Sequence, residues 1–241
     1  MYISIVPILR IDNFLERGPN QLTTLVVSPH PDDEVLGVGG TLLRRKAEGA
    51  SISWLIMTGI STESGWSSQA VTQRKDEIAR ITELFGFESV FELAYPTTQL
   101  DQIPMRELVS AVATVLKQHS PQEIFVPHPS DIHSDHRITF DVLASCTKWF
   151  RSPSIKRILA YETLSETEFG LEPSKRFHPN VYVNIEGFLE EKLRAVNIYS
   201  SEIQDFPFPR SNEAILALAT LRGASSGFRA AEAFELLKES S

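Results

Sequence analysis

The sequence contains a single cysteine, Cys146, so neither an intrachain disulfide framework nor a cysteine-rich zinc site can form. No run approaches the roughly 18 consecutive apolar residues that a membrane-spanning helix requires. Basic residues are in the minority, with 23 lysines and arginines against 31 acids, and the formal net charge is −8. Because sequence-independent nucleic-acid binding needs a basic face, this balance argues against nucleic acid as a partner.

The N-terminal segment has few features of an export signal. Residues 1–9 are apolar but short, Pro7 interrupts them, and no basic residue precedes them. We therefore expect a cytoplasmic protein. Residues 1–22 precede the first predicted core strand, and we treat them as an N-terminal extension that adds an edge strand, packs on a neighbour or frays. The sequence leaves open whether the chain forms homo-oligomers.

The remaining chain, residues 23–241, is predicted to form one α/β domain, because apolar runs alternate with helical patterns. Predicted strands cover residues 23–28, 51–57, 90–94, 123–126, 155–162 and 181–185. Predicted helices cover residues 36–48, 69–85, 105–119, 135–150, 187–199, 211–221 and 230–238. This alternation predicts a Rossmann-like, mostly parallel sheet with helices on both faces. Ligands of such folds bind outside the carboxyl ends of the strands, so polar residues that follow strands are candidate site residues.

A first polar cluster, His30-Pro31-Asp32-Asp33-Glu34, follows the first predicted strand. An ordinary helix start explains its acids, because negative charge favours the positive end of the helix dipole. It does not explain His30, and adjacent acids repel one another unless a cation compensates them. His30 and Asp33 are three residues apart, which puts them on one face of a first helical turn, as a chelating pair requires. This cluster alone leaves a helix start and a metal site equally open.

Three glycines, Gly37, Gly39 and Gly40, come after the acids. A dinucleotide-binding fingerprint places its glycines between strand and helix, where the pyrophosphate approaches. Here acids occupy that place and would repel phosphate. We therefore interpret the glycines as small residues that let a helix pack closely on the sheet.

A second polar cluster follows a later strand and spans residues 127–137. It holds three of the six histidines, and His133 and His136 are again three residues apart at a predicted helix start. Asp135 lies between them and can orient an imidazole by accepting its N–H. Both clusters follow strands of one parallel sheet, so both can face one crevice. Histidines and a carboxylate without sulfur describe a catalytic zinc site with an open position, although such ligands also accept Fe²⁺ or cobalt.

The two clusters resemble the paired motifs of the PIG-L/LmbE deacetylases. Arg74 and Glu77 resemble the Arg-x-x-Glu helix of that family, and residues 231–234 resemble its common C-terminal ending. The resemblance implies an LmbE-like fold and a zinc-dependent N-deacetylase. Its expected substrate is a small amino sugar of the N-acetylglucosamine type, or a conjugate of one.

The resemblance also implies roles for single residues. Three residues are the implied zinc ligands: His30, Asp33 and His136. Asp32 is the implied general base, a protonated His133 is expected to share the charge of the oxyanion, and Asp135 lies behind a histidine. Arg74 is expected to contact the sugar, with an ion pair to Glu77 on the helix surface as the open alternative.

Other residues leave the substrate open. Tyr95-Pro96-Thr97-Thr98 stands where many relatives carry an acidic residue, which leaves the sugar and its attached group undefined. Residues 59–68, with Trp66, form either a sugar platform or an ordinary loop. Arg210 and Arg222 are candidates to contact an anionic group of the substrate, but taken singly each is expected at the solvated surface.

Three alternative functions remain from the sequence. One is an amidase of a thiol-sugar conjugate, which keeps the metal and changes the substrate. Another is a non-catalytic carbohydrate-binding relative, although such a protein has no use for the spare base Asp32. The third is a nucleotide-binding Rossmann protein, which the acidic first loop opposes.

Overall fold

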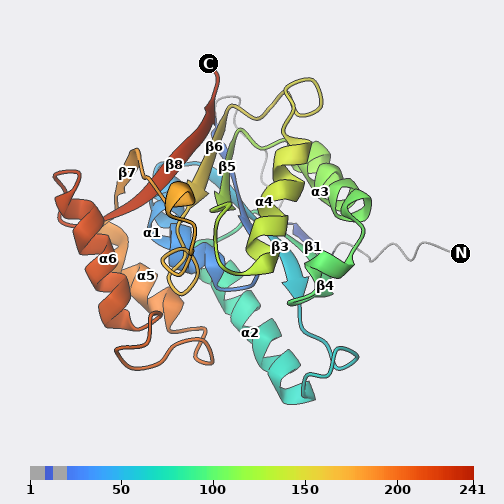
Figure 1. Cartoon of the computed structure of the whole chain (residues 1–241), viewed down its shortest axis with the longest axis horizontal. Coiled ribbons are helices and arrows are strands. Elements are labelled where there is room, and N and C mark those ends of the chain that lie inside the picture. The colour runs from blue at the N-terminus through green and yellow to red at the C-terminus, as the bar shows by residue number, and fades with distance from the viewer. Residues whose placement is uncertain (1–8, 13–20) are drawn as a thin grey trace, which may run out of the picture.

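The computed structural model describes residues 9–12 and 21–241 (Figure 1). These residues form an eight-stranded sheet in the order β1-β4-β3-β2-β5-β6-β8-β7. Its strands are β1 (Leu9–Asp12), β2 (Thr23–Ser28), β3 (Ser51–Gly59), β4 (Ser89–Pro96), β5 (Glu123–Pro127), β6 (Arg157–Tyr161), β7 (Val181–Asn184) and β8 (Ala231–Glu239). Strands β4, β3, β2, β5 and β6 run parallel, which confirms the predicted fold class.

Helices cover both faces of the sheet. They are α1 (Asp33–Ala47), α2 (Ser68–Phe85), α3 (Met105–His119), α4 (Ser134–Cys146), α5 (Leu189–Val196) and α6 (Asn212–Ala224), with short 3₁₀ turns η1 (Leu100–Gln102), η2 (Pro173–Lys175) and η3 (Glu186–Phe188). One apolar core lies under α1, α2, α5 and α6, and a second lies under α3 and α4 (Figure 1). Adjacent residues of β2 serve different cores, since Val26 joins the first and Val27 the second. Both faces of the central strands are therefore buried.

The order of the strands positions the functional clusters. From β2 the chain proceeds outward through β3 to β4, whereas β5 and β6 lie on the opposite side of β2. The strand order therefore reverses between β2 and β5, and a crevice opens at the carboxyl ends of these two strands. The two polar clusters of the sequence follow these two strands.

The glycines of α1 allow close helix packing, as the sequence predicts. A Cβ atom on Gly37 would lie 2.3 Å from Cδ2 of Tyr161, and one on Gly40 would lie 2.8 Å from Cβ of Ile185. Either contact is shorter than packed carbon atoms tolerate. These two positions fix how closely α1 approaches β6 and the segment after β7.

The predicted helix over residues 230–238 is wrong, because this segment is strand β8. It pairs antiparallel with β6 on one side and with β7 on the other. Residues 231–234 are buried, and the ring of Phe234 lies 4.9 Å from that of Phe125. Strong helix formers such as Ala, Glu and Leu fill the segment, but pairing on both edges and burial of Phe234 override this local propensity.

Boundaries of other elements differ by a few residues. Helix α1 begins three residues before the predicted start, and α4 ends at Cys146, four residues before the predicted end.

Within the N-terminal extension, β1 pairs antiparallel with β4 and adds an edge strand. Residues 1–8 and 13–20 of that extension lie outside the described residues. In the described part of the chain, no helix combines the length and apolar character needed to cross a membrane.

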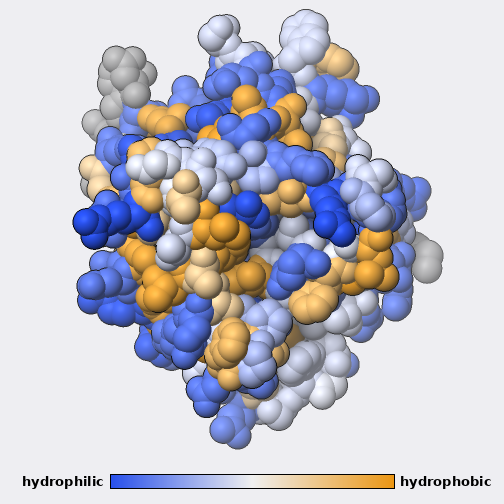
Figure 2. Space-filling view, turned by 60° about the vertical axis from the view of Figure 1, so that its left-hand side comes forward, coloured by the Kyte–Doolittle hydropathy of each residue, from blue (hydrophilic) through white to orange (hydrophobic). Residues whose placement is uncertain are grey.

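The molecular surface carries apolar and hydrophilic patches side by side. Figure 2 shows the face that includes the α5 and α6 side of the molecule, where separate apolar patches lie between hydrophilic ones. Helix α6 contributes exposed leucines to this surface, with Leu221 at 58% exposure.

Candidate active site

The two polar clusters meet at the crevice between β2 and β5. His30 lies in the turn after β2, Asp33 begins α1, and His136 lies in the first turn of α4. His30 Nδ1 is 3.5 Å from Asp33 Oδ2, and His136 Nε2 is 3.4 Å from Asp33 Oδ1. One ligand atom from each of the three residues lies within 4.8 Å of the others. The structure thus brings together the three residues that the sequence indicates as metal ligands.

Two carboxylates behind the imidazoles orient them. Asp131 Oδ2 lies 2.8 Å from His136 Nδ1, and Asp135 Oδ2 lies 3.1 Å from His30 Nε2. Each contact leaves the other ring nitrogen turned toward Asp33. Carboxylates in this position fix the orientation of metal-binding histidines. Asp135 behind a histidine agrees with the expectation from the sequence. Asp131 was not predicted as a site residue. The feature that could have indicated it is an acidic residue five positions before His136 in a histidine-rich loop.

The two orienting carboxylates are themselves held in place. The backbone N–H groups of Thr98 and Leu100 donate to Asp135 at 2.7 and 3.1 Å. The hydroxyl of Thr167 donates to Asp131 Oδ1 at 2.7 Å. Both carboxylates are fully buried, so these donors compensate part of the cost of burying charge. Thr97 and Thr98 line the cavity, and the backbone of Thr98 positions Asp135.

The turn after β2 uses two of its acids as backbone acceptors. Asp33 Oδ2 accepts the N–H of His30 at 2.8 Å, and Glu34 Oε2 accepts the N–H of Asp32 at 3.0 Å. Asp32 occupies the N-cap position with a φ of 135°, and its side chain makes no capping hydrogen bond. A helix start thus explains the acids only in part. The carboxylate of Asp32 faces the cavity instead, where Arg210 Nη1 lies 2.8 Å from its Oδ2.

The two neighbouring aspartates have opposite pKa shifts. Burial and the charge of Asp33 raise the pKa of Asp32 to about 7, against the opposing influence of Arg210. Burial opposes ionisation of Asp33 as well, but the charges of His136 and His30 hold its pKa at about 2. Carboxyl groups with separated pKa values can take different roles in one site. Asp33 is the permanent anion of the pair, and Asp32 exchanges a proton near neutral pH.

His133 lies beside this cluster at the N-cap of α4. Its ring centroid is 4.6 Å from that of His30, and its Nδ1 accepts the N–H of Asp135 at 3.1 Å. Burial, together with the positive charges of His30 and His136, lowers the pKa of His133 to about 4. This shift favours a neutral imidazole, whereas the sequence-based expectation is a protonated His133. Because Nδ1 is an acceptor, the neutral ring carries its proton on Nε2.

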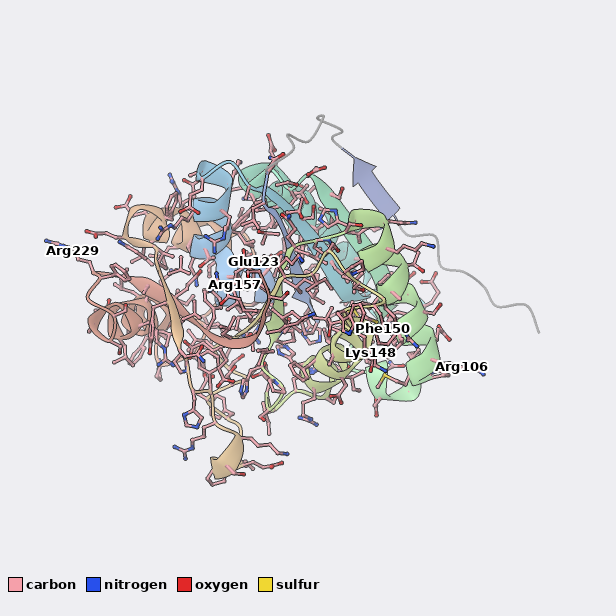
Figure 3. The ribbon with its side chains drawn as sticks, turned by 90° about the horizontal axis from the view of Figure 1, so that it is seen from above. Arg106, Glu123, Lys148, Phe150, Arg157 and Arg229 are labelled. Carbon is pink, nitrogen blue, oxygen red and sulfur yellow. The ribbon has the colours of Figure 1, made fainter. Side chains whose placement is uncertain are left out.

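The charge balance at this edge of the sheet fits a bound divalent cation. At the opposite edge, buried Glu123 on β5 is paired with Arg45 at 2.9 Å and with Arg157 at 3.7 Å (Figure 3). At the crevice, buried carboxylates belong to Asp32, Asp33, Glu34, Asp131 and Asp135. Within the described residues, only the first of these pairs with an arginine or lysine. Without a metal, protonated His30 and His136 supply the positive charge beside Asp33. A divalent metal between the two imidazoles and this carboxylate would supply that charge instead.

Arginines complete the cavity wall. Arg74 Nε lies 2.9 Å from Glu77 Oε2, as the ion-pair alternative expected, and Nη2 donates to Glu202 at 2.5 Å. Arg74 also donates to the carbonyl of Pro31 at 2.9 Å, which ties α2 to the turn after β2. The expectation that Arg210 lies at the solvated surface is wrong, because this side chain is 22% exposed and paired with Asp32.

These residues surround one cavity of about 450 Å³. Trp66 lines it from the loop between β3 and α2. Arg222 lies elsewhere and pairs with Glu162 at 2.6 Å.

The family assignment agrees with this geometry. The family described as "PIG-L: GlcNAc-PI de-N-acetylase" matches residues 25–147. The match covers half of the chain and includes both polar clusters. The chain therefore belongs to the PIG-L family.

Individual relatives extend the similarity beyond the family segment. The diacetylchitobiose deacetylase of Thermococcus kodakarensis is 26% identical over 223 residues, covering 86% of this chain and 80% of the relative. A probable N-acetyl-alpha-D-glucosaminyl L-malate deacetylase 2 of Bacillus anthracis is 23% identical over 195 residues, covering 76% and 82%. The solved structure of the conserved protein TT1542 from Thermus thermophilus is 30% identical with a TM-score of 0.71, covering 89% of this chain and 94% of that one. The curated relatives are named as deacetylases with different substrates.

Proposed function

We propose that this protein is a metal-dependent hydrolase that removes the N-acetyl group from an N-acetylglucosamine-type sugar or sugar conjugate. The observation that carries the proposal is the convergence of His30, Asp33 and His136 at the switch point of the sheet, with Asp32 beside them and facing the cavity. Two relatives named as deacetylases of acetylated sugars support the choice of reaction and of substrate class.

The metal ligands are His30 Nδ1, Asp33 and His136 Nε2, and we propose zinc as the ion, with Fe²⁺ as the alternative. When bound, such an ion supplies a Lewis acid that polarises the amide carbonyl and lowers the pKa of water. Asp131 and Asp135 hold the two imidazoles so that these nitrogens converge. The side chains therefore need little reorganisation to bind the ion.

Asp32 is the general base of the proposed reaction. Its carboxylate takes a proton from the attacking water and returns one to the leaving amine. A pKa of about 7 suits both steps, because general acid–base catalysis works best when the pKa lies near the operating pH. Arg210, at 2.8 Å, holds the carboxylate in its place at the cavity wall.

His133 and Arg74 act on the substrate. The Nε2–H of neutral His133 donates a hydrogen bond to the oxygen of the amide as negative charge develops there. Removal of one such donor typically costs about 10²–10³ in turnover. Arg74 lines the cavity from α2, where it is placed to contact the hydroxyl groups of the sugar.

The test combines metal analysis with release of free amine from N-acetylated amino sugars. We expect about one equivalent of metal in the wild type, its loss in His136→Ala, and loss of activity on treatment with a chelator. Asp32→Asn should keep its metal and lose most turnover. His178→Ala, an exposed histidine outside the cavity, is the matched control and should change neither. Absence of metal from the wild type after zinc is supplied, or equal metal loss in both site variants, would contradict the assignment.

A further inference from the structure

The cavity has two chemically different sides, one on each flank of the three proposed metal ligands His30, Asp33 and His136. On the flank of β3 and β4, five apolar side chains line it: Ile60, Trp66, Val71, Ile78 and Ala94. We call this set the apolar arm. On the flank that follows β6, the lining is polar: Thr163, Ser165, Glu166, Glu202 and Arg210. We call this set the polar arm.

The apolar arm is open to a ligand. Trp66 is 46% exposed although it lines a cavity, whereas Ile78, which also lines it, belongs to the first core. Ala94 lies at an irregularity of β4, where the register against β3 shifts, and has a φ of 53°. This left-handed conformation costs an alanine about 1 kcal/mol or more, and it leaves Ala94 exposed in the middle of a strand. Strained backbone of this kind is concentrated at binding sites.

The two arginines that line the cavity are already paired. Arg74 contacts Glu77 and Glu202, and Arg210 contacts Asp32 as well as Glu202, the latter at 3.4 Å. An anionic group of a substrate would have to displace one of these carboxylates.

Two charged residues of opposite sign, Glu92 and Lys75, lie beside the apolar arm. Burial raises the pKa of Glu92, and the positive charge of Lys75 opposes that shift, which shows that the two groups interact. Both line the cavity beside the apolar arm. With one charge of each sign, this flank carries no net charge to select an ionic substituent.

The polar arm has the groups that sugar hydroxyls need. The Oγ1 of Thr163 is buried and has no hydrogen-bond partner among the described residues. A buried hydroxyl without a partner is unfavourable, and Thr163 lines the cavity at this flank. Ser165, with a φ of 77°, and Glu166 add further polar groups beside it. The two flanks thus suit two chemically different parts of one substrate.

We propose that the substrate is an N-acetylated amino sugar that carries an uncharged apolar substituent, such as an aryl or alkyl chain, and that the apolar arm binds this substituent. The inference rests on the proposed function, since it places the acetamide at the metal cluster. It disfavours an acidic substituent, because both arginines of the cavity are paired with carboxylates and the charge of Lys75 stands beside the opposite charge of Glu92. It also disfavours a second sugar ring, whose hydroxyls would lose water against Ile60, Val71 and Ile78.

The test compares kcat/KM for amine release across a matched panel. The panel contains N-acetylglucosamine, its p-nitrophenyl and octyl glycosides, its 6-O-octanoyl ester, N,N′-diacetylchitobiose and a glycoside with a dicarboxylic acid. We expect an aryl or alkyl derivative to exceed N-acetylglucosamine, diacetylchitobiose and the acidic glycoside by about 10- to 100-fold, the range that one well-fitted apolar group supplies. A best substrate among diacetylchitobiose, the acidic glycoside or the free sugar would overturn the inference.

Two variants connect the preference to the arm. Trp66→Ala and Val71→Lys should reduce the advantage of the apolar derivatives to a few-fold or less while retaining activity on N-acetylglucosamine. Trp149→Ala, an exposed tryptophan beyond the end of α4 and outside the cavity, is the matched control and should keep the full preference. An unchanged preference in both arm variants would show that the substituent binds elsewhere. If no member of the panel releases amine, the proposed function itself fails, which is a different result from hydrolysis without preference.

Discussion

Replacement of the three α1 glycines by alanine tests how the helix that begins with Asp33 is positioned. The three positions lie within one turn of the same helix, so alanine brings each the same gain in intrinsic propensity, about 1 kcal/mol. They differ in what the new methyl group meets. At Gly39 the nearest atoms, on Lys192 and Val35, are 3.4 Å away, which is ordinary contact.

At Gly37 the methyl group meets Tyr161. It would lie 2.3 Å from Cδ2 and 2.9 Å from Cγ of a ring that is fully buried. The ring cannot turn away freely, because its hydroxyl donates to the carbonyl of Val27 at 2.9 Å. Overpacking costs about 1–3 kcal/mol, and loss of that hydrogen bond costs about 1 kcal/mol more. After the gain in propensity, Gly37→Ala should destabilise the protein by about 1–3 kcal/mol.

The measurement is the free energy of unfolding from urea titrations, with unchanged m-values as the check on two-state comparison. We expect Gly39→Ala to be neutral or more stable than the wild type by up to about 1 kcal/mol. Gly40→Ala should behave like Gly37→Ala, since its methyl group would lie 2.8 Å from Ile185. Metal affinity should fall with Gly37→Ala, one helical turn from Asp33, and stay unchanged with Gly39→Ala. Equal stability of the Gly37 and Gly39 variants would refute this account of the packing.

Three further outcomes follow from other buried groups. Asp131→Asn should weaken metal binding about 10- to 100-fold in a metal titration, because it removes the carboxylate that orients His136. Unchanged affinity would show that Asp131 does not support metal binding in this way. Lys192→Met leaves Glu232 buried without the ammonium group 2.6 Å away and should cost about 3–5 kcal/mol of unfolding free energy, whereas a merely exposed pair would cost under about 1 kcal/mol. Burial raises the pKa of Glu34 from 4.5 to about 8, so the folded state holds a proton that the unfolded state releases. The stability from this group is present below pH 4.5 and is lost as pH rises through about 8. Glu34→Gln should therefore flatten the dependence of unfolding free energy on pH between about 5 and 8, and an unchanged slope would contradict this.

Many strands of the sheet, and much of the His/Asp site at its edge, could be predicted from local sequence. Apolar runs bounded by turn residues mark β2, β3 and β5, and each polar cluster directly follows one of these strands. In a parallel sheet the carboxyl ends of the strands share one edge, so two clusters that follow strands converge. Spacing indicated the pairs His30/Asp33 and His133/His136, and the family resemblance selected His30, Asp33 and His136 as the ligands.

Other site residues depend on contacts between distant segments. Arg210 reaches Asp32 from 178 positions away, and nothing in the residues around it distinguishes it from a surface arginine. The lowered pKa of His133 is also a tertiary property, because it results from burial and from two neighbouring imidazoles. Asp131 gains its role only through the position of His136 on the first turn of α4.

The sequence by itself determined the α/β class, the run of small residues in α1 and the His/Asp motifs, because these follow from local periodicity, residue size and spacing. The tertiary structure decided that Gly37 and Gly40, and not Gly39, make the close contacts. Only the tertiary structure decided that residues 231–239 form a strand, since hydrogen bonding to β6 and β7 outweighs the helix propensity of that segment. It also decided which charges meet across the cavity and which flank is apolar. Those features arise where segments far apart in the chain pack together, so their energies cannot be assigned to any local stretch of residues.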